Sequence, residues 1–523
     1  MCIGCHACTV ACKSEYDMPI GVNRTHVKYI EKGTFPNSTR EFSVHRCNHC
    51  ADAPCVEICP TTALYNRADG IVDFDNDRCI GCKSCMQACP YDALYMDPNT
   101  NTAAKCNYCA HKVDYGYEPA CVVVCPVEAI VSGDLDDTNS KIAQLVANED
   151  TMTRKSEKMT DPNLYYVNGT SEMLDATATD RDSDYLWSEQ SKGVGHFAKY
   201  AEERLAESDT ENLLVQLAME NSAKTGKPID HRAIDNVAKE IQKDVDTKGA
   251  RRVYDTPSKG VLWGWEVPAY VWTKALATGT FIMMTIWQLF LGELSPSSEM
   301  IGLIIALTFM GLTGGLLVKD LDRPDRFLYV LLRPQWKSWL VRGAYVITIF
   351  GGLVTLKLLG HFVSIPTDWI WWVGGVLAIL GAIYTAFLFA QARARDLWQT
   401  PIQSAIHMLV HAIMMGSGVM MVIVPESIGI MVNILMLGIG LNLLTIGKEI
   451  LLPHDTPDTK EAIRMMTKGF YSKYFWRGII VGNLIPVILI ILEWPIVAGV
   501  LALVGIFLTE YVRIRVPQMI PLS

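Results

Sequence analysis

Sixteen cysteines within the first 125 residues constrain this chain more than any other feature. They fall into four groups of four. The first and third groups have the spacing C-x2-C-x2-C-x3-C, the second C-x2-C-x4-C-x3-C, and the fourth C-x2-C-x11-C-x3-C. In chain order the groups are Cys2, Cys5, Cys8 and Cys12; Cys47, Cys50, Cys55 and Cys59; Cys79, Cys82, Cys85 and Cys89; and Cys106, Cys109, Cys121 and Cys125.

This spacing predicts iron–sulfur chemistry. A [4Fe-4S] cluster takes four soft thiolate ligands, and in two-cluster ferredoxins the fourth cysteine, which precedes a proline, ligates the other cluster. Pro60, Pro90 and Pro126 follow the last three groups in this way. We therefore predict four [4Fe-4S] clusters in two ferredoxin-like pairs. Structural zinc and disulfides are the alternatives, but zinc sites rarely place four cysteines in twelve residues, and disulfide frameworks suit small secreted chains.

Two glycines support close backbone packing in these loops. Gly4 and Gly81 each lie inside the first C-x2-C unit of a C-x2-C-x2-C group. Glycine is expected where the backbone must pass close to a cluster.

Composition divides the 523 residues into a polar part and a membrane part. The first 255 or so residues are charged and contain every cysteine, whereas long apolar runs dominate the remainder. The net charge of −9 and the lack of a basic cluster in the polar part argue against a nucleic-acid partner. Length and composition thus predict more than one domain.

The cysteine groups resemble the four-cluster ferredoxin subunit of molybdopterin oxidoreductase complexes, such as polysulfide and dimethyl sulfoxide reductases. The segments HCADAPC and GYEPAC carry the resemblance, which covers roughly residues 1 to 170. It implies that the groups interlock, the first with the fourth and the second with the third. The implied ligand sets are Cys2, Cys5, Cys8 and Cys125; Cys106, Cys109, Cys121 and Cys12; Cys47, Cys50, Cys55 and Cys89; and Cys79, Cys82, Cys85 and Cys59.

The start of the chain lacks one expected feature. Strand-like runs, REFSVH and GIVDFDNDR, lead into the second and third groups, but only Met1 precedes Cys2. We therefore expect that the chain is truncated or that its start is misassigned. A signal segment would then be missing from view.

The segment from residue 134 to 255 is charged and contains no cysteine. Helical periodicity predicts two helices in it, near residues 197–220 and 231–245. We interpret this segment as a connecting and docking region without chemistry of its own.

Eight apolar stretches are long enough to cross a bilayer. The predicted spans are 268–291, 299–318, 339–360, 369–391, 402–424, 427–447, 477–493 and 495–513. The predicted fold is therefore an α+β ferredoxin-like double domain followed by an all-α membrane bundle of about eight transmembrane helices. The predicted domain boundaries are 1–133, 134–255 and 256–523.

Loop charges predict how the chain is oriented. Lys and Arg lie before the first span, in every second loop and at the C-terminus, whereas the other loops have none. The positive-inside rule then places both termini and the cluster domain in the cytoplasm of a prokaryote. The molybdopterin family often places its clusters on the outer side, so that orientation stays open.

The membrane half resembles the NrfD-type membrane subunit of polysulfide reductase. The segments VLWGWEVPAYVWTKALATG and KDLDRPDRFLYVLLRPQWKSWLVRGAY carry this resemblance, which covers roughly residues 260 to 515. It implies electron exchange with quinone and no haem. His407 and His411 lie at i and i+4 on one span, a poor arrangement for two ligands of one iron, and we expect interhelical hydrogen bonds from both.

Ionisable residues at the cluster-facing membrane ends are candidate quinone ligands. Charged groups in membranes are costly and are usually functional. The candidates are Glu266, Tyr270 and Lys274 on one helix face, and Asp320, Arg323 and Arg326 in the second loop, with His407 and Tyr384 as weaker choices. Alternatively, these residues form salt bridges at the helix ends, and the long side chains extend their charged groups to the membrane surface.

These observations predict an electron-transfer and membrane-anchor subunit without catalytic residues of its own. Electrons would pass through four [4Fe-4S] clusters between a catalytic, molybdopterin-dependent partner and the quinone pool in the lipid membrane. Two alternatives stay open: redox-linked ion translocation, and a passive anchor without a quinone site. Lys357, His361, Glu426 and Glu510 show no evident alignment in the sequence that would favour ion translocation.

Overall fold

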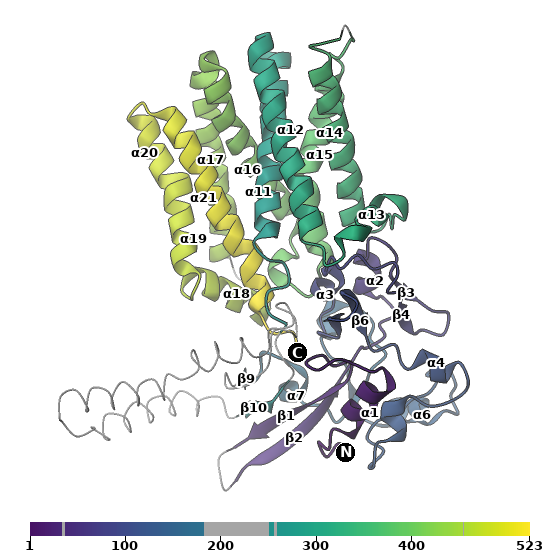
Figure 1. The fold of residues 1–523 in the computed structure, drawn as a ribbon. Coiled ribbons are helices and arrows are strands. Elements are labelled where there is room, and N and C mark those ends of the chain that lie inside the picture. The colour runs from purple at the N-terminus through teal and green to yellow at the C-terminus, as the bar shows by residue number, and fades with distance from the viewer. Residues whose placement is uncertain (34–36, 182–249, 256–258, 364, 453, 455) are drawn as a thin grey trace, which may run out of the picture.

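The computed structural model describes residues 1–33, 37–181, 250–255, 259–363, 365–452, 454 and 456–523. The cysteine-rich domain lies against one end of a bundle of long helices (Figure 1). An α+β cysteine-rich region followed by a helical region is the architecture that the sequence predicts. The two helices predicted near residues 197–220 and 231–245 lie outside the described residues.

Short elements between the cysteine loops build the cluster domain. Its helices are α1 (Ala7–Glu15), α2 (Pro54–Ile58), α3 (Ser84–Ala88), α4 (Ala110–Val113), α5 (Ala120–Val123), α6 (Lys141–Asn148) and α7 (Ser171–Leu174). Its strands are β1 (His26–Lys32), β2 (Thr39–His45), β3 (Leu64–Asn66), β4 (Val72–Phe74), β5 (Leu94–Asp97), β6 (Thr102–Lys105), β7 (Thr151–Met152), β8 (Tyr166–Val167), β9 (Asp180–Arg181) and β10 (Ala250–Tyr254). The strands predicted before Cys47 and Cys79 are present as β2 and β4.

Distant parts of the chain close this domain. The antiparallel hairpin of β1 and β2 continues through β10 to β9, so the residues just before the membrane half complete its sheet. The C-terminal residues also return to it, because Arg154 donates to the Leu522 carbonyl and Arg252 donates to the Ser523 carbonyl at 2.9 Å. The cluster domain thus holds both ends of the membrane half.

Among the described residues, eight helices are long and apolar enough to cross a membrane, and they match the predicted spans. The helices of this half are α11 (Glu266–Ile286), α12 (Pro296–Lys319), α13 (Tyr329–Leu332), α14 (Trp339–Leu359), α15 (Ile370–Gln391), α16 (Pro401–Ile423), α17 (Ile428–Leu451), α18 (Pro457–Thr467), α19 (Ser472–Ile479), α20 (Ile485–Ile491) and α21 (Pro495–Arg515). Helices α19 and α20 form one span through the π-helical turn Ile480–Leu484. The short helices α13 and α18 do not span.

Helices α11 and α16 form the centre of the bundle and are its most buried spans. Small residues let their backbones touch: a Cβ on Gly279 would lie 1.9 Å from the Ala412 carbonyl oxygen, and one on Gly416 would lie 2.1 Å from that of Gly279. Close approach through small residues is a general mode of helix packing in membranes.

We expect Gly279→Ala to lower the melting temperature of the purified protein, because the added methyl group forces two central helices apart. Overpacking of this kind costs about 1–3 kcal/mol. Gly311→Ala is the matched control, since a Cβ at Gly311 on α12 meets no atom within 4 Å. Equal melting temperatures for the two variants in detergent would contradict the close α11–α16 contact.

Candidate iron–sulfur and quinone sites

The last two cysteines of each group lie four residues apart, on or beside a short helix. Helix α2 contains Cys55 and α3 contains Cys85. Cys59 and Cys89 are the C-caps of these helices and have extended backbone, with ψ of 118° and 111°. Proline follows each cap and prevents the helix from continuing. In the second and third groups the fourth cysteine therefore leaves the helical turn that holds the third, whereas Cys12 of the first group stays inside α1 (Ala7–Glu15).

Electrostatic neighbours show which thiols lie close together. Burial raises the pKa of Cys2, and the thiolates of Cys125 and Cys5 raise it further. Burial raises the pKa of Cys12 to about 12, with Cys106, Cys121 and Cys109 as its thiolate neighbours. Cys125 and the three neighbours of Cys12 belong to the fourth group, as the implied pairing of the first group with the fourth requires.

The second and third groups interlock in the same way. Burial raises the pKa of Cys55, and Cys89 is its first thiolate neighbour, followed by Cys47 and Cys50. Burial also raises the pKa of Cys82 to about 12, with Cys59 and Cys79 beside it. The four thiols of Cys59, Cys79, Cys82 and Cys85 line one cavity. Four converging thiols and a cavity among them are a donor set that fits a [4Fe-4S] cluster.

The four thiol sets form a row. Cys8 in the first set lies near Cys121 in the second. Cys106 in the second set lies near Cys47 in the third, and Cys55 in the third set lies near Cys85 in the fourth. The first set is the most exposed, since Cys5 is exposed and Cys2 and Cys125 are partly exposed. The row therefore runs from this exposed set, through two buried sets, to the fourth set, in which Cys79 and Cys82 are partly exposed.

Hydrogen-bond donors surround the sulfurs. Arg46 Nη1 lies 3.1 Å from Cys121 Sγ, and the backbone N–H groups of Ala63 and Ala129 lie 3.2 Å from Cys59 Sγ and 3.1 Å from Cys125 Sγ. Donors to ligating sulfurs stabilise added negative charge and tune the reduction potential of a cluster. The placement of these donors suits cysteine sulfurs that carry negative charge as thiolates.

The fourth set lies directly on the membrane half. Asp322 N–H and Arg323 N–H donate to the carbonyls of Gly81 and Ile80, each at 3.3 Å. Lys83 Nζ forms an ion pair with Asp322 at 2.8 Å, and Trp263 Nε1 donates to the Cys82 carbonyl at 3.2 Å. This cysteine loop is therefore held by the loop after α12 and by the residues before α11.

Gly81 has a more specific role than the sequence predicts. It has φ of +68°, and a Cβ there would lie 2.7 Å from the Cβ of Asp322. The close neighbour of this backbone is thus a membrane-domain side chain. A Cβ on Gly4 would meet the Phe42 ring at 2.5 Å.

The predicted quinone residues divide into two groups. Arg323 Nη1 donates to the Thr100 carbonyl at 3.2 Å, and Arg326 Nη1 donates to the Asn76 and Cys79 carbonyls at 2.7 and 3.2 Å. Both arginines also form ion pairs with Asp325. Their guanidinium groups hold the cluster domain, as the alternative interpretation of salt bridging at helix ends expects.

Glu266, Tyr270 and Asp320 lie close together at the cluster-facing ends of α11 and α12. Glu266 forms an ion pair with Lys319 at 3.4 Å, and Tyr270 is 4% exposed. Burial raises the pKa of Asp320 to about 7; Lys83 lowers it, and Glu266 and Asp322 raise it. Its carboxyl therefore titrates near neutral pH, which suits a group that exchanges protons.

Lys274 lies deeper in the bundle and is 1% exposed. Its Nζ donates to the Ala382 carbonyl at 3.0 Å and to Thr385 Oγ1 at 2.5 Å, and lies 4.4 Å from the centre of the Tyr384 ring. The candidates on α11 thus lead from the cluster interface into the membrane.

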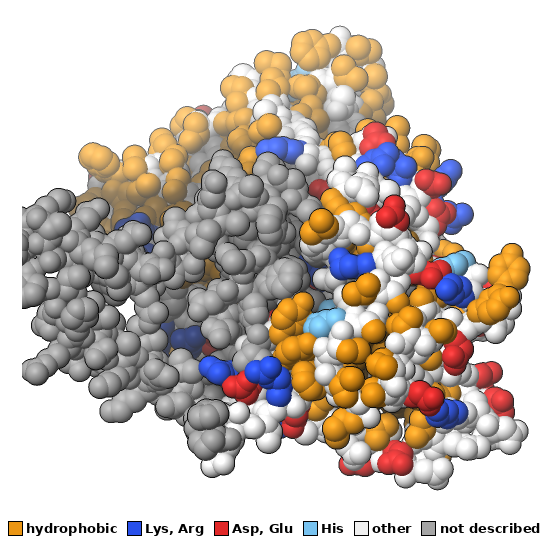
Figure 2. All heavy atoms as spheres, turned by 60° about the horizontal axis from the view of Figure 1, so that its bottom comes forward, with side chains coloured by type: hydrophobic (Ala, Val, Ile, Leu, Met, Phe, Trp, Pro, Cys, Tyr) orange, Lys and Arg blue, Asp and Glu red, His pale blue; other side chains and the backbone are white. Residues whose placement is uncertain are grey.

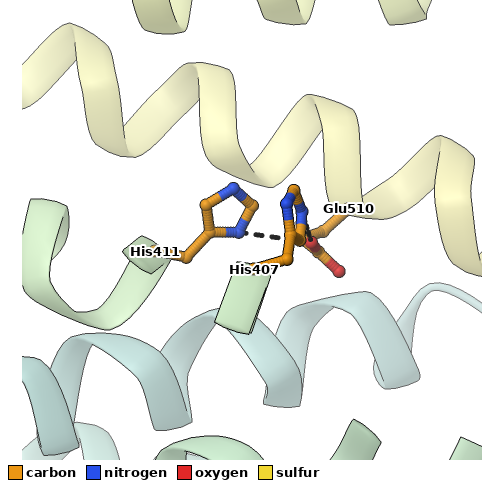
Figure 3. A group of neighbouring side chains, drawn as sticks. All are labelled: His407, His411 and Glu510. Carbon is orange, nitrogen blue, oxygen red and sulfur yellow. Dashed lines mark hydrogen bonds and ion pairs between the residues drawn. The ribbon is translucent and has the colours of Figure 1, made fainter. Parts of the chain in front are cut away.

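One buried polar group was not predicted from the sequence. His407, His411 and Glu510 come together between α16 and α21, and their ligand atoms all lie within 4.8 Å of one another (Figure 3). His407 also contacts Thr445 at 2.9 Å, and His411 contacts Asn442 at 3.0 Å, so the interhelical hydrogen bonds expected of both histidines are confirmed. The sequence offered two signals for this group: two histidines four residues apart in one predicted span, and a glutamate in another.

Two protein families match the chain. The 4Fe-4S dicluster domain matches residues 39–135, and the family Polysulphide reductase, NrfD, matches residues 255–521, just over half of the chain. The two matches fall on the cluster domain and the membrane half respectively.

Curated relatives match about a third of the chain and most of their own length. A polysulfide reductase component of Wolinella succinogenes is 44% identical over 170 residues, which cover 32% of this chain and 89% of the relative. A tetrathionate reductase component of Salmonella typhimurium is 38% identical over 192 residues, 36% of this chain and 76% of the relative. The arsenate respiratory reductase iron-sulfur subunit of a Shewanella species is 35% identical over 214 residues, 32% of this chain and 92% of the relative.

We expect Asp320→Asn to stabilise the protein at alkaline pH. Because the folded-state pKa of about 7 exceeds the ordinary value of 3.8, the contribution of Asp320 to stability is full below pH 3.8 and is lost as pH rises to about 7. The variant should therefore melt a few degrees above the unmodified protein at pH 8, with a smaller gain at pH 5. Asp325→Asn, an exposed change on the same loop, should give no gain. A pH-independent difference for Asp320→Asn would contradict this assignment.

Proposed function

The chain belongs to the NrfD family of polysulphide reductase proteins, and from this membership and the row of thiol sets we propose that it carries electrons between a catalytic partner subunit and membrane quinone. It joins an iron–sulfur electron-transfer region to an NrfD membrane domain of the kind found in respiratory reductases. The eight candidate spans among the described residues make it an integral membrane protein.

One observation carries the proposal: the thiol sets run from an exposed end to the membrane interface. We propose that each of the four sets holds one [4Fe-4S] cluster. The first two sets combine cysteines of the first and fourth groups, and the last two combine cysteines of the second and third groups. When bound, such clusters supply one-electron carriers. The protein contributes the thiolates, the donors to sulfur and the fixed docking of the last set against Asp322 and Trp263.

The exposed end of the row is the proposed docking surface for a catalytic, molybdopterin-dependent subunit. Large apolar side chains are exposed in the segments that flank Cys5 and Cys125: Ile3, Val10, Tyr115, Tyr117, Val123 and Val124. Figure 2 views the molecule toward this end and shows hydrophobic side chains gathered on the described surface of the cluster domain. Interfaces are enriched in apolar and aromatic side chains, so this surface supports a partner there.

We propose that quinone binds at the cluster-facing ends of α11 and α12, beside Glu266, Tyr270, Lys274 and Asp320. This position lies next to Trp263, which contacts the cysteine loop of the fourth set. The Asp320 carboxyl and the Tyr270 hydroxyl are suited to hydrogen-bonding quinone oxygens and exchanging protons with them. Arg323 and Arg326 would act indirectly, by holding the cluster domain against this region.

Two cysteine variants test the electron path. We expect about sixteen irons per chain in the purified complex and about four fewer in either Cys5→Ser or Cys82→Ser. Cys82→Ser should prevent a quinol analogue from reducing the remaining clusters, because it removes the set beside the membrane. Cys5→Ser should leave quinol reduction intact and block delivery to the catalytic partner. EPR of the quinol-treated complexes measures how far the remaining clusters are reduced in each variant.

Other outcomes would identify a different role. Zinc in place of iron would overturn the cluster assignment. Full iron without any response to quinol would favour a passive anchor.

We further propose that the cluster domain faces the cytoplasm. The loops beside the cluster domain carry the Lys and Arg residues, as the positive-inside rule requires. We therefore expect Glu426→Cys, exposed at the far end of the bundle, to react with an impermeant maleimide added to intact cells. The matched variant Lys468→Cys, exposed on the cluster side, should react only after lysis. The reverse pattern would place the clusters outside.

A further inference from the structure

Glu510 is the centre of a buried hydrogen-bond network in the membrane half. Its Oε1 lies 3.1 Å from His407 Nε2, 3.2 Å from His411 Nδ1 and 3.5 Å from Arg513 Nη1. The side chains of Glu510 and both histidines are at most 3% exposed. Figure 3 shows the two histidines on α16 and the glutamate on α21, with the dashed contacts between them.

The network extends in two directions from this centre. Toward the middle of the bundle, His411 contacts Asn442 at 3.0 Å, and Asn442 Nδ2 donates to Asn483 Oδ1 at 2.9 Å. Toward the cluster-facing end, Arg513 Nη2 forms an ion pair with Glu449 at 2.7 Å. The charged and titratable groups that face Glu510 therefore come from α11, α16, α17 and α21: Lys274, His407, His411, Glu449 and Arg513.

Small cavities adjoin Glu510 on two sides. One, with room for about one water molecule, is lined by Lys274, His411 and Glu510 together with apolar residues. The other is lined by Glu449, Glu510 and Arg513, with Trp398 and Phe389 on its apolar side. Lys274 is one of the proposed quinone residues, so the first cavity connects the proposed quinone region with Glu510, and the second connects Glu510 with Glu449.

All these groups lie in the half of the bundle nearest the cluster domain. Glu510 is five residues from the end of α21, Lys274 is eight residues from the start of α11, and His411 is ten from the start of α16. At 1.5 Å per residue they lie about 8 to 15 Å deep, and thus no further than the middle of a hydrocarbon core of about 30 Å.

A separate ionic group lies at the opposite end, where Glu299 pairs with Lys357 at 3.2 Å and with His361 at 3.3 Å. Among the residues that the structure describes, no hydrogen bond or ion pair links this group to Glu510. The polar network thus opens toward the cluster-facing side.

The same three ligand atoms offer a site for a metal ion, but their surroundings favour a proton. Arg513 already brings positive charge to the single carboxylate. Each histidine has partners on both ring nitrogens, which is the arrangement that a proton-exchanging imidazole needs.

We propose that Glu510, His407 and His411 form a proton-holding site for the quinone reaction, which exchanges protons with the cluster-facing side of the membrane through the Arg513–Glu449 exit. This inference rests on the proposed quinone function. Oxidation of one quinol gives one quinone, two electrons and two protons. The electrons pass to the iron–sulfur domain. The two protons follow one after the other: each adds to a histidine ring nitrogen, which makes an imidazolium beside the Glu510 carboxylate, and leaves past Glu449 before the next one arrives. Quinone reduction runs the same steps in reverse.

The test compares two carboxylates of the membrane half that each pair with histidine: Glu510, which is buried, and Glu299, which is 15% exposed. In the purified complex, Glu510→Gln should slow cluster reduction by a quinol analogue at least ten-fold and flatten its pH dependence. Dithionite reduction and iron content should stay unchanged, because neither requires this proton site. Glu299→Gln, the matched control at the opposite end, should stay within two-fold of the unmodified rate.

A second variant tests the same proposal if Glu510→Gln fails to fold. Glu449→Gln should slow the same reaction less, and a small weak acid such as hydrazoic acid should restore its rate, because the acid replaces the missing exit group. In vesicles that hold the complex in one orientation, a pH dye should report proton release on the cluster-facing side.

Each remaining outcome overturns the inference. An unmodified rate and pH dependence in Glu510→Gln, a zinc ion that is lost in that variant, or proton release on the opposite side would exclude the proton-holding role. If the unmodified complex fails to respond to quinol, the proposed function fails and this inference fails with it. If it responds and Glu510→Gln responds equally, only this inference fails.

Discussion

The contact between the cysteine loop of the fourth set, residues 79–85, and the loop after α12 is the interaction on which the remainder of the structure depends. Backbone hydrogen bonds from Asp322 and Arg323 to Gly81 and Ile80 fix the main chain, and the Lys83–Asp322 ion pair adds a charged contact. Backbone-to-backbone bonds leave less freedom than a pair of long side chains would. A thiol set and the membrane helices therefore keep one separation, which a path for electrons requires.

Further contacts from the ends of the membrane half support this arrangement. Arg395 is 5% exposed and donates to Gln87 of the cluster domain at 2.9 Å and to the Pro517 and Ile520 carbonyls. Burial lowers the pKa of Arg395 to about 10, so it stays charged at neutral pH. Gln87 Nε2 also donates to Gln518 at 2.6 Å. A buried charge with several carbonyl acceptors is costly to separate, so these groups favour a single docked geometry.

Buried ionisable groups concentrate at the end of the bundle nearest the clusters. Lys274 and Glu510 are each at most 2% exposed, in a part of the chain where charge is expensive. The neighbouring His407, His411 and Arg513 offset that cost through hydrogen bonds and opposite charge. The far end has a separate group around Lys357. The proposed electron transfer and the proposed proton transfer would thus take place at the same face of the membrane.

The sequence alone determined the features that depend on local spacing and composition. Cysteines such as Cys2, Cys5 and Cys8 must converge because three residues of chain cannot separate them far, and apolar length alone defines the eight spans. Only the tertiary structure decided which distant groups meet: Arg326 with the cysteine loop, β10 with β1, and Glu510 with His411. Helical periodicity assigns a residue to a face but does not name the helix opposite, so contacts across about a hundred residues or more depend on how the bundle packs.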